Sequence, residues 1–305
     1  MDTMKSIITV KNLRKTYGKL VAVDDISFEI EEGEIFGFLG PNGAGKTTTV
    51  ECLQALRNPD SGDISIGGIN PKHDAPACRR LIGSQLQESA LPDRIKVWEA
   101  LDLFGSVSPN AADWQILLEQ WGLTEKKNAS FSALSGGQRQ RLFIALALVN
   151  NPKVVFLDEM TTGLDPAARR VAWDLIRAIR EKGATVVLVT HFMDEAENLC
   201  DRLAVVNHGR IIASGTPHGL ITQYAPELRV IFTSEKPVLP WLKDVKGVKN
   251  VSVTGKRVEV TGSGPVLALT AVALAAHGIV PDDLRSVQPS LEDVFLKLTG
   301  KTTGE

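Results

Sequence analysis

The sequence predicts an α/β fold built around a largely parallel sheet, followed by a smaller α+β domain. A glycine-rich loop at residues 40–47 lies between a short apolar run and a segment with helical character. Two later runs, residues 154–157 and 185–189, are continuously apolar, as strands buried on both faces are. After about residue 225 the order of strands and helices changes, so we expect a second domain there.

The composition limits the classes of partner. The chain has 305 residues, enough for about two domains, and its 34 basic and 36 acidic residues leave a net charge of −2. This balance, without long runs of one sign, argues against a nucleic-acid partner and a polybasic membrane anchor. The longest strongly apolar stretch, residues 266–276, is shorter than the ~20 residues that span a bilayer. Because the first residues also lack the features of a secretion signal, we expect a cytoplasmic location.

An antiparallel sheet is expected to begin the fold. Residues 7–10 and 22–30 alternate apolar and polar side chains, which is typical of half-buried strands. The apolar run 34–39 then leads into the glycine-rich loop, and residues 46–56 suit a helix. A phosphate-binding loop requires this order of strand, loop and helix.

Residues 88–150 are predicted to form a helical subdomain. They show helical periodicity interrupted by Pro92, Pro109 and Gly122, and they contain no run of β-branched residues. Strands resume after this insert, and a helix expected at 167–182 lies between the two apolar runs. This order of strand, helix and strand favours a right-handed parallel crossover.

The second domain is predicted at residues 225–300 and the first at residues 5–224. Its expected elements follow the order βαββαβ, which is typical of a small ferredoxin-like domain, and a further helix begins at Ser290. The strands are expected at 228–232, on both sides of a turn at 254–256 and near 285–287, and the helices near 238–245 and at 265–276.

The loop at residues 40–47 matches the pattern GxxxxGK[ST] of phosphate loops that bind nucleoside triphosphates. Its glycines let backbone N–H groups curl around the phosphates, and the start of the following helix adds partial positive charge. Lys46 is expected to reach the β- and γ-phosphates, and the hydroxyl of Thr47 is expected to bind Mg²⁺. The residues assigned to nucleotide binding here are Gly40, Pro41, Asn42, Gly43, Ala44, Gly45, Lys46, Thr47 and Thr48.

An acidic pair follows the apolar run 154–157. We assign Asp158 to hold Mg²⁺ and Glu159 to polarise the water that attacks the phosphate. An apolar strand that ends in two acids is common in proteins, so this assignment depends on the phosphate loop in the same chain. Together the two motifs predict hydrolysis of a nucleoside triphosphate.

The most discriminating motif is LSGGQ at residues 134–138, directly before a helical segment. With this motif the sequence resembles the nucleotide-binding domains of ATP-binding-cassette (ABC) proteins, over about residues 5–223. Four further positions of that family appear in the family's order: Tyr17, Gln87, Asp165 and His191. The resemblance implies the ABC type of P-loop NTPase fold, with a mixed core sheet, an antiparallel β subdomain and a helical subdomain. It also implies an ATPase with ATP and Mg²⁺ as cofactors.

The resemblance implies roles for these residues. Tyr17 would stack on the adenine, Gln87 would contact Mg²⁺, and His191 would contact the γ-phosphate and the attacking water. Alternatives stay open for all four residues. Tyr17 could be an ordinary aromatic residue, His191 could be a surface histidine, and Gln85 could take the place of Gln87. Asp165, a cross-dimer contact in the family, could act as a helix N-cap.

Members of the family form head-to-tail dimers in which each ATP lies between one subunit's phosphate loop and the other subunit's signature motif. The signature residues Ser135, Gly136, Gly137 and Gln138 form a second anion-binding turn at a helix N-terminus. Because one nucleotide cannot readily be reached by both loops of one chain, a second copy of the chain is an expected partner.

Further motifs resemble those of bacterial drug and antibiotic exporter ATPases. They lie at residues 190–197, 200–202, 209–211 and 289–295. This resemblance implies a separate integral-membrane permease as partner, a drug-, antibiotic- or lipid-like substrate, and a peripheral position on the inner face of the cell membrane. The alternative is a soluble ABC-type ATPase clamp that acts on a macromolecular complex. The single phosphate loop and the absence of long heptad repeats favour the transporter.

Overall fold

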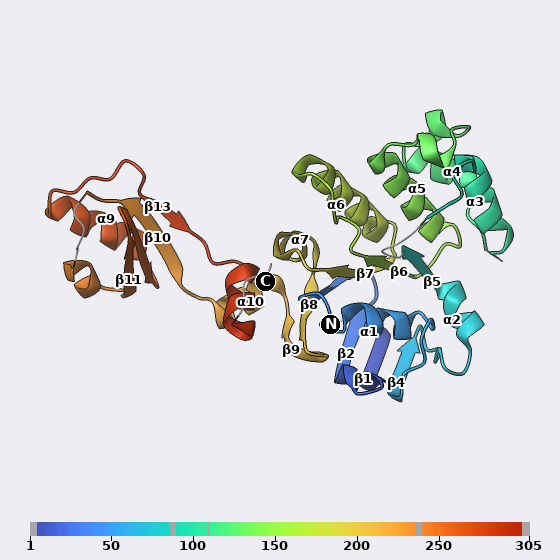
Figure 1. The fold of residues 1–305 in the computed structure, drawn as a ribbon, viewed down its shortest axis with the longest axis horizontal. Helices are drawn as coiled ribbons and strands as arrows, with labels where there is room; N and C mark the ends of the chain where they lie inside the picture. The colour runs from blue at the N-terminus through green and yellow to red at the C-terminus, as the bar shows by residue number, and fades with distance from the viewer. Residues whose placement is uncertain (1–4, 86–89, 109, 236–239, 301–305) are drawn as a thin grey trace. The chain divides into compact units, whose positions relative to one another are not determined.

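The structure is a computed structural model that describes residues 5–85, 90–108, 110–235 and 240–300 (Figure 1). Its contacts divide the chain into two units, Met1–Pro217 and His218–Glu305. Helix α8 (Pro217–Tyr224) therefore groups with the second unit, whereas the boundary placed from the sequence lies after it. The domain limits of 5–224 and 225–300 stay predictions. No helix in the described parts of the chain is long and apolar enough to cross a membrane.

The first unit is built on a six-stranded sheet with the order β5-β6-β7-β3-β8-β9. Its strands are β3 (Ile35–Leu39), β5 (Ile82–Gln85), β6 (Val154–Asp158), β7 (Thr185–Thr190), β8 (Arg202–Asn207) and β9 (Arg210–Gly215). Neighbouring strands are parallel except β8 and β9, which are antiparallel. Every residue of β3, β6 and β7 is buried, as the apolar runs within them predict. The mixed core sheet is thus confirmed, and the carboxyl ends of its parallel strands meet at one edge.

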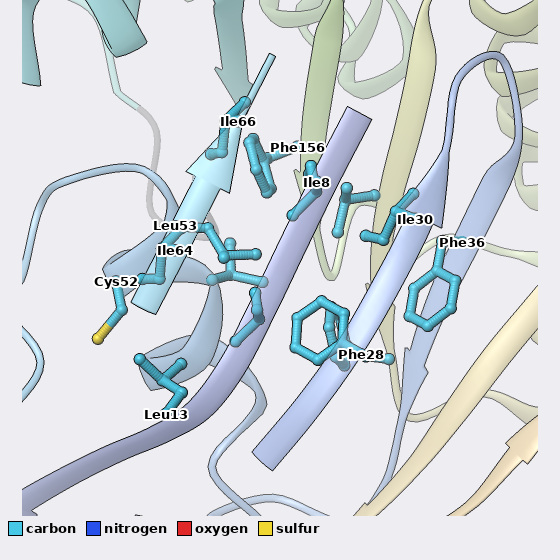
Figure 2. Close-up of a cluster of buried hydrophobic side chains, with 14 of the residues drawn as sticks. Ile8, Leu13, Phe28, Ile30, Phe36, Cys52, Leu53, Ile64, Ile66 and Phe156 are labelled. Atoms are coloured by element: carbon cyan, nitrogen blue, oxygen red, sulfur yellow. The ribbon is translucent and has the colours of Figure 1, made fainter. Parts of the chain in front are cut away.

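A three-stranded antiparallel sheet, in the order β2-β1-β4, shares an apolar core with the central sheet. Its strands are β1 (Ser6–Tyr17), β2 (Leu20–Glu31) and β4 (Ser61–Ile66). The shared core includes Ile8 of β1, Phe28 of β2, Phe36 of β3, Leu53 of α1 (Lys46–Leu53) and Phe156 of β6 (Figure 2). The antiparallel start of the fold is confirmed. Strand β4 was missed because only two of its six residues are apolar.

The elements that the structure describes between β5 and β6 are helical. They are α3 (Val97–Ser106), α4 (Trp114–Gln120) and α5 (Gly136–Leu148), with 3₁₀ segments at Thr124–Lys126 and Phe131–Ala133. Helix α2 (Ala75–Leu81) precedes β5, α6 (Pro166–Glu181) joins β6 to β7, and α7 (Met193–Leu199) follows β7. Gly183 lies just beyond α6 with a φ of 90°, the left-handed conformation that often follows a helix. The expected unit of strand, helix and parallel strand is therefore present.

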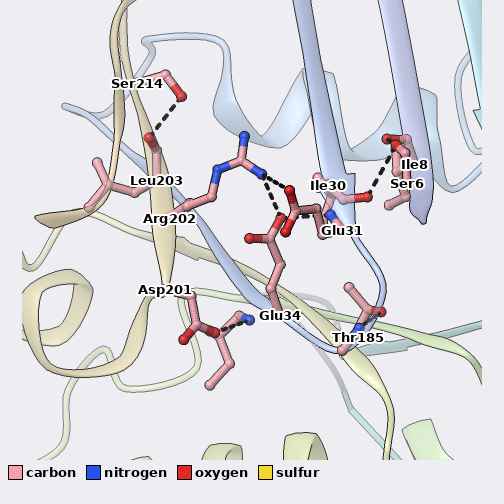
Figure 3. A network of polar contacts seen from close by, with 12 residues as sticks. Ser6, Ile8, Ile30, Glu31, Glu34, Thr185, Asp201, Arg202, Leu203 and Ser214 are labelled. Atoms are coloured by element: carbon pink, nitrogen blue, oxygen red, sulfur yellow. Dashed lines mark hydrogen bonds and ion pairs between the residues drawn. The ribbon is translucent and has the colours of Figure 1, made fainter. Parts of the chain in front are cut away.

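A polar network links the amino ends of β3 and β8 (Figure 3). Arg202 forms ion pairs with Glu34 at 3.3 Å and with Glu31 at 3.7 Å. The carboxylate of Asp201 accepts a hydrogen bond from the backbone N–H of Ile35 at 2.8 Å. Burial raises the pKa of Glu34, and the Arg202 charge opposes this rise. These contacts hold the two strands together at the sheet edge opposite the phosphate loop.

The second unit contains a four-stranded antiparallel sheet in the order β11-β12-β10-β13. Its elements after α8 are β10 (Leu228–Thr233), a 3₁₀ segment (Pro240–Asp244), β11 (Val248–Thr254), β12 (Arg257–Gly262), α9 (Val266–Ala276), β13 (Arg285–Val287) and α10 (Leu291–Thr299). This strand order is that of the expected ferredoxin-like βαββαβ arrangement. Residues 238 and 239 of the helix predicted near 238–245 lie outside the described residues, and Pro240–Asp244 form a 3₁₀ segment.

The second unit has an apolar core of its own. Phe232 of β10, Leu242 of the 3₁₀ segment and Leu274 of α9 are almost completely buried in it. The apolar side chains of α10 at Leu291 and Val294 are also buried, but they do not belong to this cluster. The sheet of the second unit is therefore stabilised chiefly by α9 and the 3₁₀ segment.

We predict that Leu242→Ala destabilises the second unit by about 2–5 kcal/mol, because it removes buried methyl groups and leaves a cavity. Urea unfolding followed by circular dichroism should show an earlier transition for this unit, while ATP binding persists. Val280→Ala is the matched control, since Val280 is 81% exposed and its truncation should change stability by no more than about 0.5 kcal/mol. Equal unfolding curves for Leu242→Ala and the parent protein would contradict this core.

Candidate functional site

The phosphate loop joins the carboxyl end of β3 to the start of α1, and two of its glycines are sterically required. A Cβ atom on Gly40 would lie 2.2 Å from the carbonyl oxygen of Val206. A Cβ atom on Gly45 would lie 2.2 Å from the carbonyl oxygen of Ala22, and Gly45 also has a φ of 103°. Only glycine accommodates both restrictions. The loop therefore packs tightly against β2 and β8, with the N-terminus of α1 behind it.

Lys46, the first residue of α1, places a buried ammonium group inside this loop. Its Nζ donates hydrogen bonds to the carbonyl oxygens of Gly40 at 2.8 Å and Pro41 at 3.0 Å. Burial lowers the pKa of Lys46, and the charges of Glu159 and Asp158 oppose the decrease. The ammonium group is thus held by backbone carbonyls close to two carboxylates, where it can also neutralise phosphate oxygens.

A cleft of about 420 Å³ lies beside the loop. Its lining comes from residues 42–48, residues 20–22 of β2, Tyr17, Glu159, and the turn at His208 and Gly209. The sequence analysis had named the loop, Tyr17 and Glu159, and the structure brings these together. It had not assigned the β2 residues or the turn between β8 and β9 to this site, although Gly209 lies in one of the exporter motifs named from the sequence.

The turn residues His208 and Gly209 contact the phosphate loop, although they lie more than 150 residues after it in the sequence. The N–H of Gly209 donates to the carbonyl of Ala44 at 2.9 Å, and its carbonyl accepts from the N–H of Asp24 at 2.8 Å. Both turn residues have positive φ, 48° for His208 and 75° for Gly209. A His-Gly pair between two strand patterns is a signal for such a turn, but nothing local to it indicates contact with the phosphate loop.

Tyr17 lies at the rim of the cleft at the end of β1, with 39% of its surface exposed. The ammonium of Lys15 and the guanidinium of Arg57 lie over its ring, 5.5 Å and 5.6 Å from the ring centre. A partly exposed ring in this place can stack on a nucleotide base. The adenine contact of Tyr17 stays a prediction.

Asp158, the last residue of β6, has the environment of a metal ligand. It is 4% exposed, and burial together with the neighbouring Glu159 charge raises its pKa to about 6, while Thr47 and Lys46 oppose the rise. Its Oδ1 atom is buried with no hydrogen-bond partner among the described residues. A buried carboxylate oxygen beside a threonine hydroxyl fits Mg²⁺, which prefers one or two carboxylates together with substrate phosphates.

Glu159 and His191 follow the neighbouring strands β6 and β7, so their side chains meet at the carboxyl edge of the sheet. The carboxylate Oε1 of Glu159 lies 3.1 Å from Nδ1 of His191. Glu159 has a φ of 47°, a conformation uncommon outside glycine, and its N–H donates to the carbonyl of Val189 at 2.9 Å. The backbone thus turns the Glu159 side chain out of the strand direction and into the cleft.

Two of the expected residues, Asp165 and Ser135, cap helices outside this cleft. The carboxylate of Asp165 accepts hydrogen bonds from the N–H groups of Ala167 and Ala168, each at 2.9 Å, at the start of α6. Ser135 caps α5 in a capping box with Gln138, whose Oε1 accepts from the N–H of Ser135 at 3.0 Å.

The signature turn is well exposed. A Cβ atom on Gly136 or Gly137 would meet nothing within 4 Å. None of the residues 135–138 is part of the lining of the phosphate-loop cleft. The signature turn and the phosphate loop therefore do not line the same cleft, and the anion-binding role of the signature turn stays a prediction.

Gln87 lies outside the described residues. Its alternative, Gln85, ends β5 opposite Leu157 of β6, one position before Asp158. The Oε1 atom of Gln85 is buried and has no hydrogen-bond partner in the described part of the chain. The choice between Gln85 and Gln87 as the Mg²⁺-contacting residue therefore stays open.

Comparison with known proteins relates this arrangement to one family. A family model described as "ABC transporter" matches residues 23–162. The Nod factor export ATP-binding protein I of Ralstonia nicotianae is 38% identical and aligns over 97% of this chain and 94% of its own length. The protein of the same name from Mesorhizobium japonicum is also 38% identical, over 95% of this chain and 86% of its own length.

Solved structures of ATP-binding cassettes resemble this chain in fold. The ADP conformation of one ABC transporter cassette has a TM-score of 0.65 and 25% identity, over 72% of this chain and 94% of that chain. A dimeric post-hydrolysis cassette bound to ADP and Pi has a TM-score of 0.61 and 28% identity, over 68% and 98%. With the sequence relatives, these likenesses show that the chain belongs to the ABC transporter family and is an ATPase that uses ATP and Mg²⁺.

Proposed function

We propose that the chain is the ATP-hydrolysing subunit of an exporter, and that it drives a drug-, antibiotic- or lipid-like compound through a separate membrane permease. One observation carries the proposal. The sequence relatives named for Nod factor export align over 97% of the chain, whereas the solved cassettes align over about 72% of it. The similarity to export proteins therefore extends into the second unit, which is not needed for an ATP-binding cassette.

In the mechanism that we propose for ATP hydrolysis, each charged side chain of the cleft has its own role. The Lys46 ammonium binds the β- and γ-phosphates, and the loop amides hold them in place. Thr47 and Asp158, with Gln87 or Gln85, would hold Mg²⁺, which neutralises phosphate charge when bound. The buried and unpaired Oδ1 atom of Asp158 supports this assignment.

Glu159 would act as the general base for the attacking water. Its carboxylate lies at the lip of the cleft, 3.1 Å from His191. With its proton on Nδ1, His191 donates to this carboxylate and fixes its direction, so Nε2 is left as an acceptor for a hydrogen bond from the attacking water. Both residues then contact the reacting atoms from neighbouring strand ends.

We further propose that two copies of the chain pair head to tail. The exposed signature turn at residues 135–137 is a helix N-terminus with backbone N–H groups available to an anion. Its separation from the phosphate-loop cleft and the dimeric cassette among the solved relatives support binding across a dimer. The permease would hold this dimer at the inner face of the cell membrane.

Glu159→Gln should lower kcat for ATP hydrolysis by about 10²-fold or more, because the amide keeps the shape of the side chain but cannot accept the water proton. Binding of ATP should stay close to that of the parent protein. Phosphate release and equilibrium binding of a fluorescent ATP analogue measure the two quantities. Glu181→Gln, an exposed residue at the end of α6, is the matched control and should hydrolyse at the parent rate. A Glu159→Gln rate near that of the parent would show that another group is the base.

Ser135→Arg should prevent formation of the ATP-bound dimer. In the background of Glu159→Gln, ATP should convert the chain to a dimer, because the nucleotide is bound but not consumed. The added arginine fills the space in front of the signature turn and removes the cap of α5, so light scattering should then report a monomer. Ser106→Arg, an exposed serine on α3, is the control and should leave the dimer intact. A dimer that survives Ser135→Arg would contradict pairing through this turn.

Export can be tested in the source cell. Deletion of the gene should raise the cell-associated amount of a labelled drug-like or lipid-like compound that the parent cell expels. The parent gene should restore efflux, and Glu159→Gln should not. If efflux of every compound tested is the same with and without the chain, the export proposal is wrong, even where the purified chain hydrolyses ATP.

A further inference from the structure

A buried side chain connects the signature helix to the loop that carries Glu159. Gln140 lies in α5, five residues or about 7.5 Å of helix after Ser135, and is 8% exposed. Its amide Nε2 donates a hydrogen bond to the carbonyl oxygen of Met160 at 2.8 Å. This contact is buried on both sides, since Met160 is 6% exposed. A buried hydrogen bond of this length has little freedom to rearrange, because loss of the partner leaves a polar group unpaired.

The bond is made at the residue next to Glu159, where the backbone is strained. The left-handed φ of Glu159 is unfavourable for a residue with a Cβ atom and persists only where the surroundings hold it. Two contacts do so on opposite sides. The N–H of Glu159 is bonded to Val189 of β7, and the carbonyl of Met160 is bonded to Gln140 of α5. The peptide units around Glu159 are therefore fixed by the core sheet on one side and by the helical insert on the other.

The same loop continues to the other residue expected at a dimer contact. After Met160 the chain makes consecutive turns, in which the N–H of Thr162 donates to Glu159 and the N–H of Leu164 donates to Thr161, both at 3.2 Å. It then ends at Asp165, the N-cap of α6. A shift of α5 would therefore act first on the Met160 carbonyl and from there on Glu159.

We propose that Gln140 is a positioning residue, which aligns Glu159 for the attacking water and couples that alignment to the placement of the signature helix α5. This inference rests on the proposed role of Glu159 as the base. In each chain Gln140 then links the loop that serves its own phosphate site to the turn that serves the site of the partner copy. Gln140 itself does not line the phosphate-loop cleft.

The test is Gln140→Met in the full-length chain. Methionine has nearly the same length but no amide, so the Met160 carbonyl loses its donor while the packing volume is kept. The kcat for ATP hydrolysis should fall about tenfold, while KM for ATP and the affinity for a fluorescent ATP analogue change by less than twofold. A packing defect alone would not produce this split between kcat and KM.

Ile144→Met is the matched control. Ile144 is fully buried one turn further along α5, and its hydrocarbon side chain forms no hydrogen bond. It should keep kcat within twofold of the parent. Gln140→Glu is the second variant, which is nearly isosteric. Its carboxylate cannot donate to the carbonyl and repels it, so kcat should fall at least as far as in Gln140→Met.

The outcomes separate this inference from the proposed function. If Gln140→Met and Gln140→Glu both keep kcat within twofold, or if Ile144→Met loses as much kcat as they do, the positioning role is wrong. An equal loss of ATP affinity in the Gln140 variants would also overturn it. Glu159→Gln is measured in the same series. If that variant stays active, the base assignment fails, whatever the Gln140 variants do.

Discussion

The charge balance between one buried ammonium group and two carboxylates is the interaction on which the site depends. Burial lowers the pKa of Lys46 and raises that of Asp158, and each group's charge opposes the shift of the other. Neither the ammonium of Lys46 nor the carboxylate of Asp158 would be stable without the other, because an unpaired buried ion costs several kcal/mol. Lys46 begins α1, which the phosphate loop joins to β3, whereas Asp158 ends β6 and Glu159 follows it. In the sheet, β3 and β6 are separated by β7. The order of the strands is therefore what brings the charges into balance.

Contacts at the amino ends of the strands fix the position of β3, whose carboxyl end leads into the phosphate loop. At the amino edge, Arg202 pairs with Glu34 and Asp201 accepts from Ile35, so β3 and β8 cannot slide against each other. Between the sheets, aromatic rings such as Phe28 and Phe36 fill a dry core. A core packed to the density of a crystal transmits strain with little loss. A loop as tight as the one at residues 40–47 can therefore keep its shape before any phosphate binds.

A single chain contains two helix N-termini that do not share a cleft and that we propose to bind the phosphates of ATP. One lies at the start of α1 and the other at the start of α5, and the buried contact from Gln140 to Met160 is the described link from α5 to the catalytic loop. In the dimer that we propose, α5 would couple the occupancy of one site to the geometry of the other. Such coupling would give a physical reason for a nucleotide site that is divided between two copies.

The sequence alone determined the parts of the protein that depend on local pattern. The glycine spacing at 40–47, the apolar runs that became β6 and β7, the acidic pair and the signature motif each carry their information within a few residues, so the core sheet and the phosphate site were predictable. The roles of Tyr17, His191 and Asp165 followed from family resemblance and not from local chemistry. The family was recognisable because its motifs are local patterns.

Only the tertiary structure decided the contacts between segments far apart in the chain. Three features have no local signature: the contact of the turn at His208 and Gly209 with the phosphate loop, the strand β4, and the bond from Gln140 to Met160. In each case the neighbour lies tens of residues away in the chain. Packing of the whole fold, and not the pattern of a segment, selects such contacts.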